Sequence, residues 1–285
     1  MKPYIIIDSH YLCYRAHYTT GDFSFAGYST GIIFGFLIAL KDLSEKFNTS
    51  NFVFCWDSPL KKNKRKLIYP GYKKRPPEKE ASNKEDKKEA HAQMAFIRDE
   101  FLPNLGYKNI FIKDGYEGDD LIADIVKRYR KEYEWIIIAS DNDLYQLLSD
   151  TVTIYDVARK RIIDSAWLKK KWGIEPSRWV DVKAIAGCKS DEVKGIQGIK
   201  EKTAINYLNG NLNQKSVAFQ KIKDSGKLIK QNYKLVVLPF DDLEGGIKLF
   251  RPEKFLNKDY FAKSCAKYGF KNLKFESFIK ALNLK

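Results

Sequence analysis

Short apolar runs alternate with helix-like segments over the first 175 residues, and this alternation constrains the fold more than any other feature of the chain. The runs are rich in β-branched and aromatic residues: YIIID (4–8), FVFCWD (52–57), NIFI (109–112), WIIIAS (135–140) and VTIYD (152–156). Continuously apolar strands are buried on both faces, and strands that alternate with helices form βαβ units. The sequence therefore predicts an α/β fold with a mostly parallel central sheet flanked by helices.

The pattern changes near residue 176. From there to the end, short helical stretches punctuated by glycine replace the strand series, as in SRWVDVKAIAG (177–187) and KTAINYLN (202–209). We therefore expect an α/β core over residues 1–175 and a helical region over residues 176–285.

Carboxylates follow the ends of four predicted strands. They are Asp8, Asp57, Glu117, Asp119, Asp120, Asp141 and Asp143. Because the carboxyl ends of parallel strands share one edge of a sheet, these acids are expected to converge there. Helix capping explains any single one of them, but not acids repeated at four strand ends. Clustered carboxylates with few His or Cys neighbours suit two Mg²⁺ ions, with Mn²⁺ as a substitute, in the arrangement used for phosphodiester displacement.

The rest of the chain is strongly basic, with 51 Lys+Arg against 36 Asp+Glu and a formal charge of +15. Such an excess favours a polyanionic partner, most simply nucleic acid. Basic residues gather in segment 58–90, where Tyr69 and Tyr72 stand among Lys73, Lys74 and Arg75. A solvated charged loop is the plain alternative. Aromatic rings among cations, directly after Asp57, favour a segment that grips a single strand of DNA.

A glycine-punctuated stretch, AIAGCKSDEVKGIQGIKEKTAINYL (184–208), carries the next signal. Gly195 and Gly198 allow a tight turn, and the N–H groups that begin the next helix can hold a backbone phosphate. Lys200 and Lys202 add positive charge, and Asp191 is a further candidate acid. An ordinary turn between two helices explains the glycines equally well. We interpret residues 191–209 as a helix–hairpin–helix-type motif.

Taken together, these motifs resemble the 5′ nuclease (flap endonuclease) family, and most closely its stand-alone phage type. The matching stretches, in the order of the family, are IIIDSHYLCYRAH, GYSTGIIFGF, FCWD, YKKRPP, GYEGDDLIADI, ASDNDLYQLL and KAIAGCKSDEVKGIQGIKEKTA. The resemblance covers roughly residues 4–210. It implies a PIN-like nuclease core, a helical arch at 58–95 through which a 5′ single strand passes, and a hairpin motif that binds duplex DNA.

The resemblance also implies roles for the matched positions. The first metal would be held by Asp8, Asp57, Glu117, Asp119 and Asp120, and the second by Asp141, Asp143 and Asp191. Catalysis would rest on Asp8, Asp57 and Asp141 together with Lys73 and Arg75, which would steady the scissile phosphate. Contacts to DNA would come from Tyr14, Arg15, Tyr72, Lys73, Lys74, Arg75, Gly195, Gly198, Lys200, Lys202 and Thr203. Many relatives hold a potassium ion at the hairpin turn.

Two positions depart from the family pattern. The usual G-D-x-x-D before the hairpin is GCKSD here, so Cys188 stands where the family has its first Asp. A neutral thiol is a poor ligand for Mg²⁺, so the second metal is expected to bind more weakly or through water. The family's GIG is GIK here, and Lys200 would be strained in a conformation that only glycine adopts easily.

The expected function is a metal-dependent 5′→3′ nuclease acting on DNA with 5′ flaps, ends or nicks, and on RNA–DNA hybrids, leaving 5′-phosphate products during replication. A non-catalytic structure-specific DNA-binding protein and a PIN-type ribonuclease are the alternatives. No apolar run reaches about 18 residues, which predicts no membrane span. The cysteines are spaced as reduced thiols rather than as a disulfide framework. We expect a monomer in the cytoplasm, or in the host cytoplasm if a phage encodes the chain.

Overall fold

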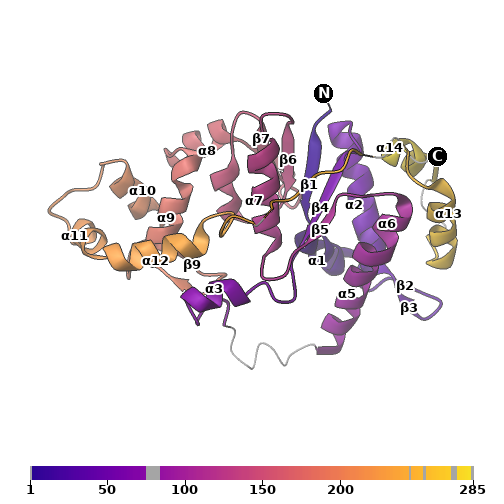
Figure 1. The fold of residues 1–285 in the computed structure, drawn as a ribbon, viewed down its shortest axis with the longest axis horizontal. Helices are drawn as coiled ribbons and strands as arrows, with labels where there is room; N and C mark the ends of the chain where they lie inside the picture. The colour runs from indigo at the N-terminus through magenta and orange to yellow at the C-terminus, as the bar shows by residue number, and fades with distance from the viewer. Residues whose placement is uncertain (1, 75–83, 244, 253–254, 271–274, 284–285) are drawn as a thin grey trace.

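The computed structural model describes residues 2–74, 84–243, 245–252, 255–270 and 275–283. Within these ranges the central sheet has six strands in the order β5-β4-β1-β6-β7-β8 (Figure 1). They are β1 (Tyr4–Asp8), β4 (Phe52–Trp56), β5 (Ile110–Ile112), β6 (Trp135–Ile138), β7 (Val152–Asp156) and β8 (Arg161–Ile163). Neighbouring strands run parallel except β7 and β8, which are antiparallel. The predicted mostly parallel sheet is confirmed, whereas the edge strand β8 was not predicted.

Strand β1 lies at the centre of the sheet and is buried on both faces. Its side chains alternate, so that Ile5 and Ile7 join the hydrophobic core on one face and Ile6 joins the core on the other. In the register of the sheet, Ile6 lies between Val53 of β4 and Ile137 of β6. Burial on both sides explains why these strands appear in the sequence as unbroken apolar runs.

Helices cover both faces of the sheet (Figure 1). One core is built by β1 and β4 with α1 (Ser9–Thr20), α2 (Gly31–Phe47), α5 (Lys84–Phe96), the π-helix η1 (Ile97–Phe101), α6 (Leu102–Leu105), α13 (Lys258–Lys267) and α14 (Phe275–Leu282). The other core contains α7 (Gly118–Tyr129), the 3₁₀ helix η2 (Asn142–Leu147), α8 (Ser165–Trp172), α9 (Trp179–Ala186), α10 (Glu201–Leu208) and α11 (Val217–Asp224). The remaining elements are α3 (Asn63–Ile68), η3 (Pro176–Arg178), α12 (Gly226–Val236) and two hairpins, β2–β3 (Ser24–Phe25, Tyr28–Ser29) and β9–β10 (Gly187–Cys188, Val193–Lys194).

The residues after 176 lie at two ends of the molecule (Figure 1). Helices α9 to α12 form one end, and α9 and α10 flank the β9–β10 hairpin, which the sequence pattern did not predict. Helices α13 and α14 lie at the other end, where Phe261 and Phe278 are buried in the same core as α2. The predicted division at residue 175 therefore does not mark off a single packed helical unit.

The segment after β6 differs from expectation, and the expected arch is only partly described by the structure. The helix-like segment that follows β6 forms only the short 3₁₀ helix η2. Of the expected arch at 58–95, the structure describes residues 58–74 with α3 and the helix from residue 84, and residues 75–83 lie outside the described ranges. Within those ranges, no helix combines the length and the apolar character needed to cross a bilayer.

Candidate active site

The ends of the three central strands bring acids to one edge of the sheet. Asp8 ends β1 and caps α1, because its Oδ1 accepts the N–H of Tyr11 at 3.0 Å. Asp57 follows β4, and its Oδ1 accepts the N–H of Gly118 at 2.7 Å, which ties it to the start of α7. Asp141 follows β6 and caps η2. Because β1 pairs with both β4 and β6, the three acids lie side by side, as the sequence predicted.

These carboxylates repel one another. Burial and then the charges of Asp57 and Asp141 raise the pKa of Asp8 to about 7. Burial, followed by the charge of Asp8 and three other acids, raises the pKa of Asp119 well above its usual value. Burial and the charge of Asp143 raise the pKa of Asp141 to about 6. Mutual effects of this kind require the carboxylates to face the same space.

Asp119 lies at the centre of this repulsion. Among the described residues, none donates a hydrogen bond or forms an ion pair with its carboxylate. A half-buried carboxylate that faces four other acids and has no partner is a fitting ligand for a hard divalent cation. The oxygen donors at the strand ends therefore fit Mg²⁺ or Mn²⁺.

Asp57 differs from its neighbours because cations surround it. Burial would raise its pKa, but Lys61, His10 and the N–H of Gly118 together lower it. The Lys61 ammonium is hydrogen-bonded to Asp57 Oδ2. The N–H of Asp57 donates to His10 Nδ1 at 3.1 Å, and burial lowers the pKa of His10. Asp57 is thus held ionised beside acids that bind protons more readily.

Lys73 and Tyr72 connect the two groups of acids. The ammonium of Lys73 lies 2.8 Å from both carboxylate oxygens of Glu117 and 3.2 Å from Asp191 Oδ1. The hydroxyl of Tyr72 donates to Glu117 at 3.1 Å and to Asp191 at 3.4 Å. Although burial opposes it, Glu117 and Asp191 hold the pKa of Lys73 well above its usual value. The backbone of Lys73, at a φ of 47°, also donates to the carbonyl of Asp191 at 2.8 Å.

Asp120 lies apart from the facing carboxylates and is fully engaged. Its two oxygens accept from the Arg65 guanidinium at 2.7 and 2.8 Å, and they also accept the N–H groups of Glu117 and Phe240. Asp120 is 0% exposed and Arg65 is 2% exposed. The Arg65 guanidinium binds both oxygens of Asp120 and thereby joins α3 to α7. Asp120 therefore has no free oxygen directed toward the other acids.

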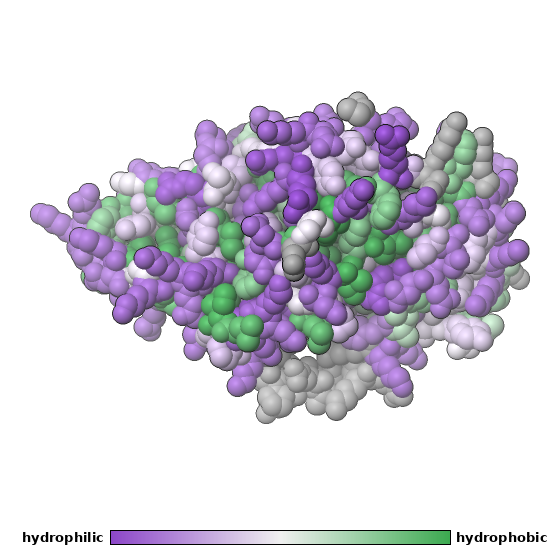
Figure 2. All heavy atoms as spheres, viewed as in Figure 1, coloured by the Kyte–Doolittle hydropathy of each residue, from purple (hydrophilic) through white to green (hydrophobic). Residues whose placement is uncertain are grey.

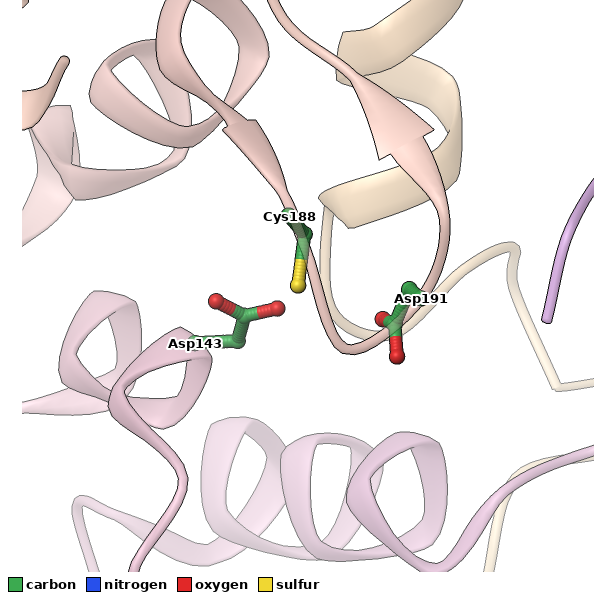
Figure 3. Close-up of side chains that lie close together, drawn as sticks. All are labelled: Asp143, Cys188 and Asp191. Carbon is green, nitrogen blue, oxygen red and sulfur yellow. The ribbon is translucent and has the colours of Figure 1, made fainter. Parts of the chain in front are cut away.

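A second group of potential ligands joins η2 to the β9–β10 hairpin. Atoms of Asp143, Cys188 and Asp191 that could bind a metal all lie within 4.8 Å of one another. Figure 3 shows these side chains projecting into the space between η2 and the hairpin. Lys183 of α9 lies 3.0 Å from Asp143 Oδ1. Burial and the two carboxylates raise the pKa of the Cys188 thiol to about 12.

The turn between β10 and α10, which belongs to the expected helix–hairpin–helix-type motif, contains two glycines that other residues could not easily replace. A Cβ on Gly195 would lie 2.0 Å from the carbonyl oxygen of Ala186, and Gly198 has a φ of 81°. Lys200 caps α10 with a φ of −110°, which any residue adopts, so the expected strain at this position is absent. The sequence-based reason for doubting a lysine there was therefore wrong.

The remaining predicted DNA contacts are spread over several elements. Tyr14 on α1 is 37% exposed, and its hydroxyl lies 3.4 Å from His91 of α5. Arg15, also on α1, is partly exposed, as is Thr203 on α10, whereas Lys74 and Lys202 are exposed. Arg75 lies outside the described residues. Contacts between these residues and DNA stay predictions.

Sequence reasoning did not single out four cationic or titratable neighbours of the acids. They are His10, Lys61, Arg65 and Lys183. Lys61 lies in the turn before α3, whereas Arg65 lies on α3 itself. Both belong to the basic segment after Asp57, and no local spacing distinguishes them from the other cations of that segment.

Known proteins resemble this chain in sequence. The family model for the "5'-3' exonuclease, N-terminal resolvase-like domain" matches residues 3–173. A 5'-3' exonuclease of Aquifex aeolicus strain VF5 is 32% identical over 272 residues, which are 90% of each chain. A thermostable DNA polymerase I of Thermus aquaticus is 34% identical over 203 residues, 70% of this chain but 23% of the polymerase. The chain thus spans about a quarter of the length of such polymerase relatives.

Among solved structures, the T5 5'-exonuclease with bound divalent metal ions (zinc) is similar in fold. It superposes with a TM-score of 0.67 at 23% sequence identity, and the match covers 82% of this chain and 89% of the other. This likeness supports the α/β fold and the arrangement of the strands around the acids.

Proposed function

The chain belongs to the 5′-3′ exonuclease family, and from this premise we propose that it is a divalent-metal-dependent nuclease that hydrolyses phosphodiester bonds at 5′ ends, flaps and nicks of DNA. The observation that carries the proposal is the repulsion among Asp8, Asp119 and Asp141 at the strand ends. Buried carboxylates that raise one another's pKa are an arrangement that cations relieve. Products would carry a 5′-phosphate.

We assign the cation ligands by their place among the carboxylates that face one another. Asp8, Asp57, Glu117 and Asp119 would hold the first ion, and Asp141, Asp143 and Asp191 would serve the second. Asp120 is omitted from the ligands, because it is fully buried and pairs with Arg65 apart from the facing carboxylates. When bound, two such ions would activate a water molecule and stabilise the oxygens of phosphodiester displacement.

The chain's own cations would complete the site. Lys73 is held between Glu117 and Asp191, so its ammonium stands beside both groups of acids, where it would steady negative charge that develops on the scissile phosphate. Tyr72 fixes the same two carboxylates through its hydroxyl. Arg75 is proposed as the partner of Lys73 on the resemblance alone.

The end of the molecule formed by α10 to α12 would bind duplex DNA. The chain exposes six lysines over residues 215–234, against a single acid, Asp224: Lys215, Lys221, Lys223, Lys227, Lys230 and Lys234. Figure 2 shows this end covered largely by hydrophilic side chains. The turn between β10 and α10, which contains Gly195 and Gly198, lies beside these lysines. Gln197 of this turn lines the same surface groove as Lys215 and Lys221. We propose that this surface holds the duplex, with a potassium ion at the turn.

The cellular setting and the wider substrate range are also proposals. Free, buried cysteines at positions 13, 55, 188 and 265 support a reducing compartment such as the cytoplasm. RNA–DNA hybrids are proposed as further substrates and a monomer as the working form.

The test is a cleavage assay on a 5′-flap duplex, a nicked duplex and an RNA–DNA hybrid across a Mg²⁺ titration. The protein should release 5′-phosphate products only with the metal. Asp119→Asn should bind the flap but not cut it, whereas Asp150→Asn, at an exposed turn, should cut like the unchanged protein. Flap binding without cleavage at any Mg²⁺ or Mn²⁺ concentration would instead indicate a non-catalytic DNA-binding protein. Cleavage of single-stranded RNA without any duplex would indicate a PIN-type ribonuclease.

A further inference from the structure

Cys188 changes the chemistry of one cation position. It lies on β9, Asp191 lies in the turn before β10, and Asp143 lies on η2, so three separate segments contribute to one small space (Figure 3). Ligand atoms in a tetrahedral zinc site lie roughly 3.5 Å apart, since Zn–S is about 2.3 Å and Zn–O about 2.0–2.2 Å. The three atoms here all lie within 4.8 Å of one another, so side-chain rotations that shorten these distances by about 1 Å would place them on one ion.

The thiol is not simply a core side chain. Cys188 is 3% exposed and belongs to a small apolar cluster with Val180 and Val193. Its Sγ, however, lies 3.0 Å from Ser190 Oγ and close to carboxylate oxygens of Asp143 and Asp191. The sulfur thus stands at the border between apolar packing and a group of polar oxygen atoms, and packing alone does not account for those polar neighbours.

Lysines leave one oxygen of each carboxylate for an ion. Lys183 lies 3.0 Å from Asp143 Oδ1 and Lys73 lies 3.2 Å from Asp191 Oδ1. Each carboxylate therefore keeps its other oxygen for coordination, apart from the long 3.4 Å contact of Tyr72 with Asp191 Oδ2. These two ammonium groups and the divalent ion would together offset the negative charge of a thiolate and two carboxylates. Partners of this kind orient the ligands of metal sites.

We propose that Asp143, Cys188 and Asp191 form a thiophilic cation site that binds Zn²⁺ or Co²⁺ in preference to Mg²⁺. Thiolates select zinc and its chemical relatives, whereas Mg²⁺ takes oxygen ligands. Coordination replaces the thiol proton, which passes to solvent, by the metal ion. Three protein ligands leave a fourth position open, which is the pattern of zinc sites that accept water or substrate. The inference rests on the proposed function for the place of the site, but its test does not require cleavage.

The first test is optical. Metal-stripped protein is titrated with Co²⁺, and a thiolate-to-cobalt charge-transfer band in the near ultraviolet is expected. Cys188→Ser should abolish the band, while Cys265→Ser should retain it, because Cys265 is another buried cysteine but lies on α13 at the far end of the molecule. Circular dichroism melting curves check that both variants fold. A missing band in the folded protein, or an equal band in folded Cys188→Ser, overturns the proposal.

The second test compares preferences by calorimetry. The unchanged protein should bind Zn²⁺ at least about tenfold more tightly than Cys188→Asp does, and Cys188→Asp should bind Mg²⁺ more tightly than the unchanged protein. This exchange of preference cannot come from a general loss of folding, because one affinity rises as the other falls. Equal Zn²⁺ affinities in the two proteins contradict the proposal.

The flap assay keeps the two hypotheses separate. Cleavage in Mg²⁺ without a cobalt band leaves the nuclease assignment standing and removes the thiophilic site. A cobalt band that depends on Cys188, in a protein that cuts no nucleic acid, supports the site and removes the nuclease assignment.

Discussion

At the scale of single residues, Asp8 shows how much the site depends on cations. Its pKa is about 7 in the folded protein, against about 4 in an unfolded chain. Below pH 4 the carboxyl is protonated in both states. Between about pH 4 and 7 only the folded state keeps the proton, so the free energy of unfolding falls as pH rises through that range.

Asp8→Asn should therefore stabilise the metal-free protein. Asn keeps the cap of α1, because its side-chain oxygen still accepts from Tyr11, but it removes the charge. In EDTA at pH 8 the variant should melt above the unchanged protein, by about 2–4 °C per kcal/mol of relieved repulsion, and the gap should shrink as pH falls to 5. Mg²⁺ should raise the melting temperature of the unchanged protein more than that of the variant, which has lost a ligand of the first ion. Identical pH profiles in EDTA would show that Asp8 carries no such repulsion.

Lys73→Ala should impair turnover far more than DNA binding. The ammonium stands beside both acid groups, and loss of a preorganised charge at a reacting phosphate lowers kcat by about 10²–10³-fold. Multiple-turnover cleavage at saturating Mg²⁺ and DNA gives kcat, and anisotropy with a labelled flap gives Kd. Lys258→Ala, at an exposed lysine on α13 at the far end of the molecule, is the matched control and should cut normally. A parallel loss of binding and turnover in Lys73→Ala would assign the side chain to DNA binding instead.

At the scale of elements, the buried Arg65–Asp120 pair fastens α3 to the core. The guanidinium binds Asp120 with both terminal nitrogens, and its Nε donates to the carbonyl of Leu235 at 3.0 Å. The pair thereby joins α3 to the start of α7 and to α12. Because Tyr72 and Lys73 follow α3 directly, this attachment also sets where the two side chains reach the acids.

Arg65→Ala should cost about 3–5 kcal/mol of unfolding free energy, because it leaves Asp120 charged, buried and unpaired. The double variant Arg65→Ala/Asp120→Asn should lose less than the sum of the single losses, with a coupling of about 0.5–3 kcal/mol. Urea denaturation measures each value. Lys66→Ala, at an exposed position on the same helix, should change stability by less than about 0.5 kcal/mol. If the losses of unfolding free energy in the single variants add up to the loss in the double variant, the two side chains stabilise the fold independently.

The strands and their terminal acids could be predicted because their signals are local. An apolar run such as residues 4–8 needs burial on both faces wherever it lies, and parallel strands place their ends at one edge. Pairings between distant residues leave no such mark. Nothing near Asp120 in the sequence distinguishes it from Asp119, and only the fold shows that Arg65 takes one and leaves the other to its neighbours.

Other elements escaped prediction for related reasons. Strand β8 is three residues long and half exposed, so it lacks an apolar run. Helix α1 presents few apolar residues, and its cap, Asp8, was assigned only to the metal site. Helices α13 and α14 pack at the far end of the molecule because their apolar faces join the core that contains α2. Helical periodicity shows that a helix has an apolar face, but not which core that face packs against.

At the scale of the whole molecule, charge is divided between two places. The acids gather at the strand ends, whereas the exposed lysines of residues 215–234 lie on the α10–α12 end, in a chain with a formal charge of +15. A polyanion would be attracted to the lysines and repelled by the acids until cations neutralise them. Binding to the lysines and metal loading at the acids should thus be separable in experiment.

Salt dependence tests that division. Binding of a flap duplex in EDTA should weaken about 10³–10⁵-fold between 50 and 200 mM salt for a surface that neutralises six to ten phosphates. Lys221→Ala/Lys230→Ala should reduce the magnitude of the slope of log Kd against log salt by about 2, because each phosphate contact contributes about 0.9. The matched pair Lys258→Ala/Lys263→Ala removes equally exposed charges from α13 at the other end and should leave the slope unchanged. Since both double variants lower net charge equally, only a local phosphate contact can separate them, and equal slopes would place the duplex elsewhere.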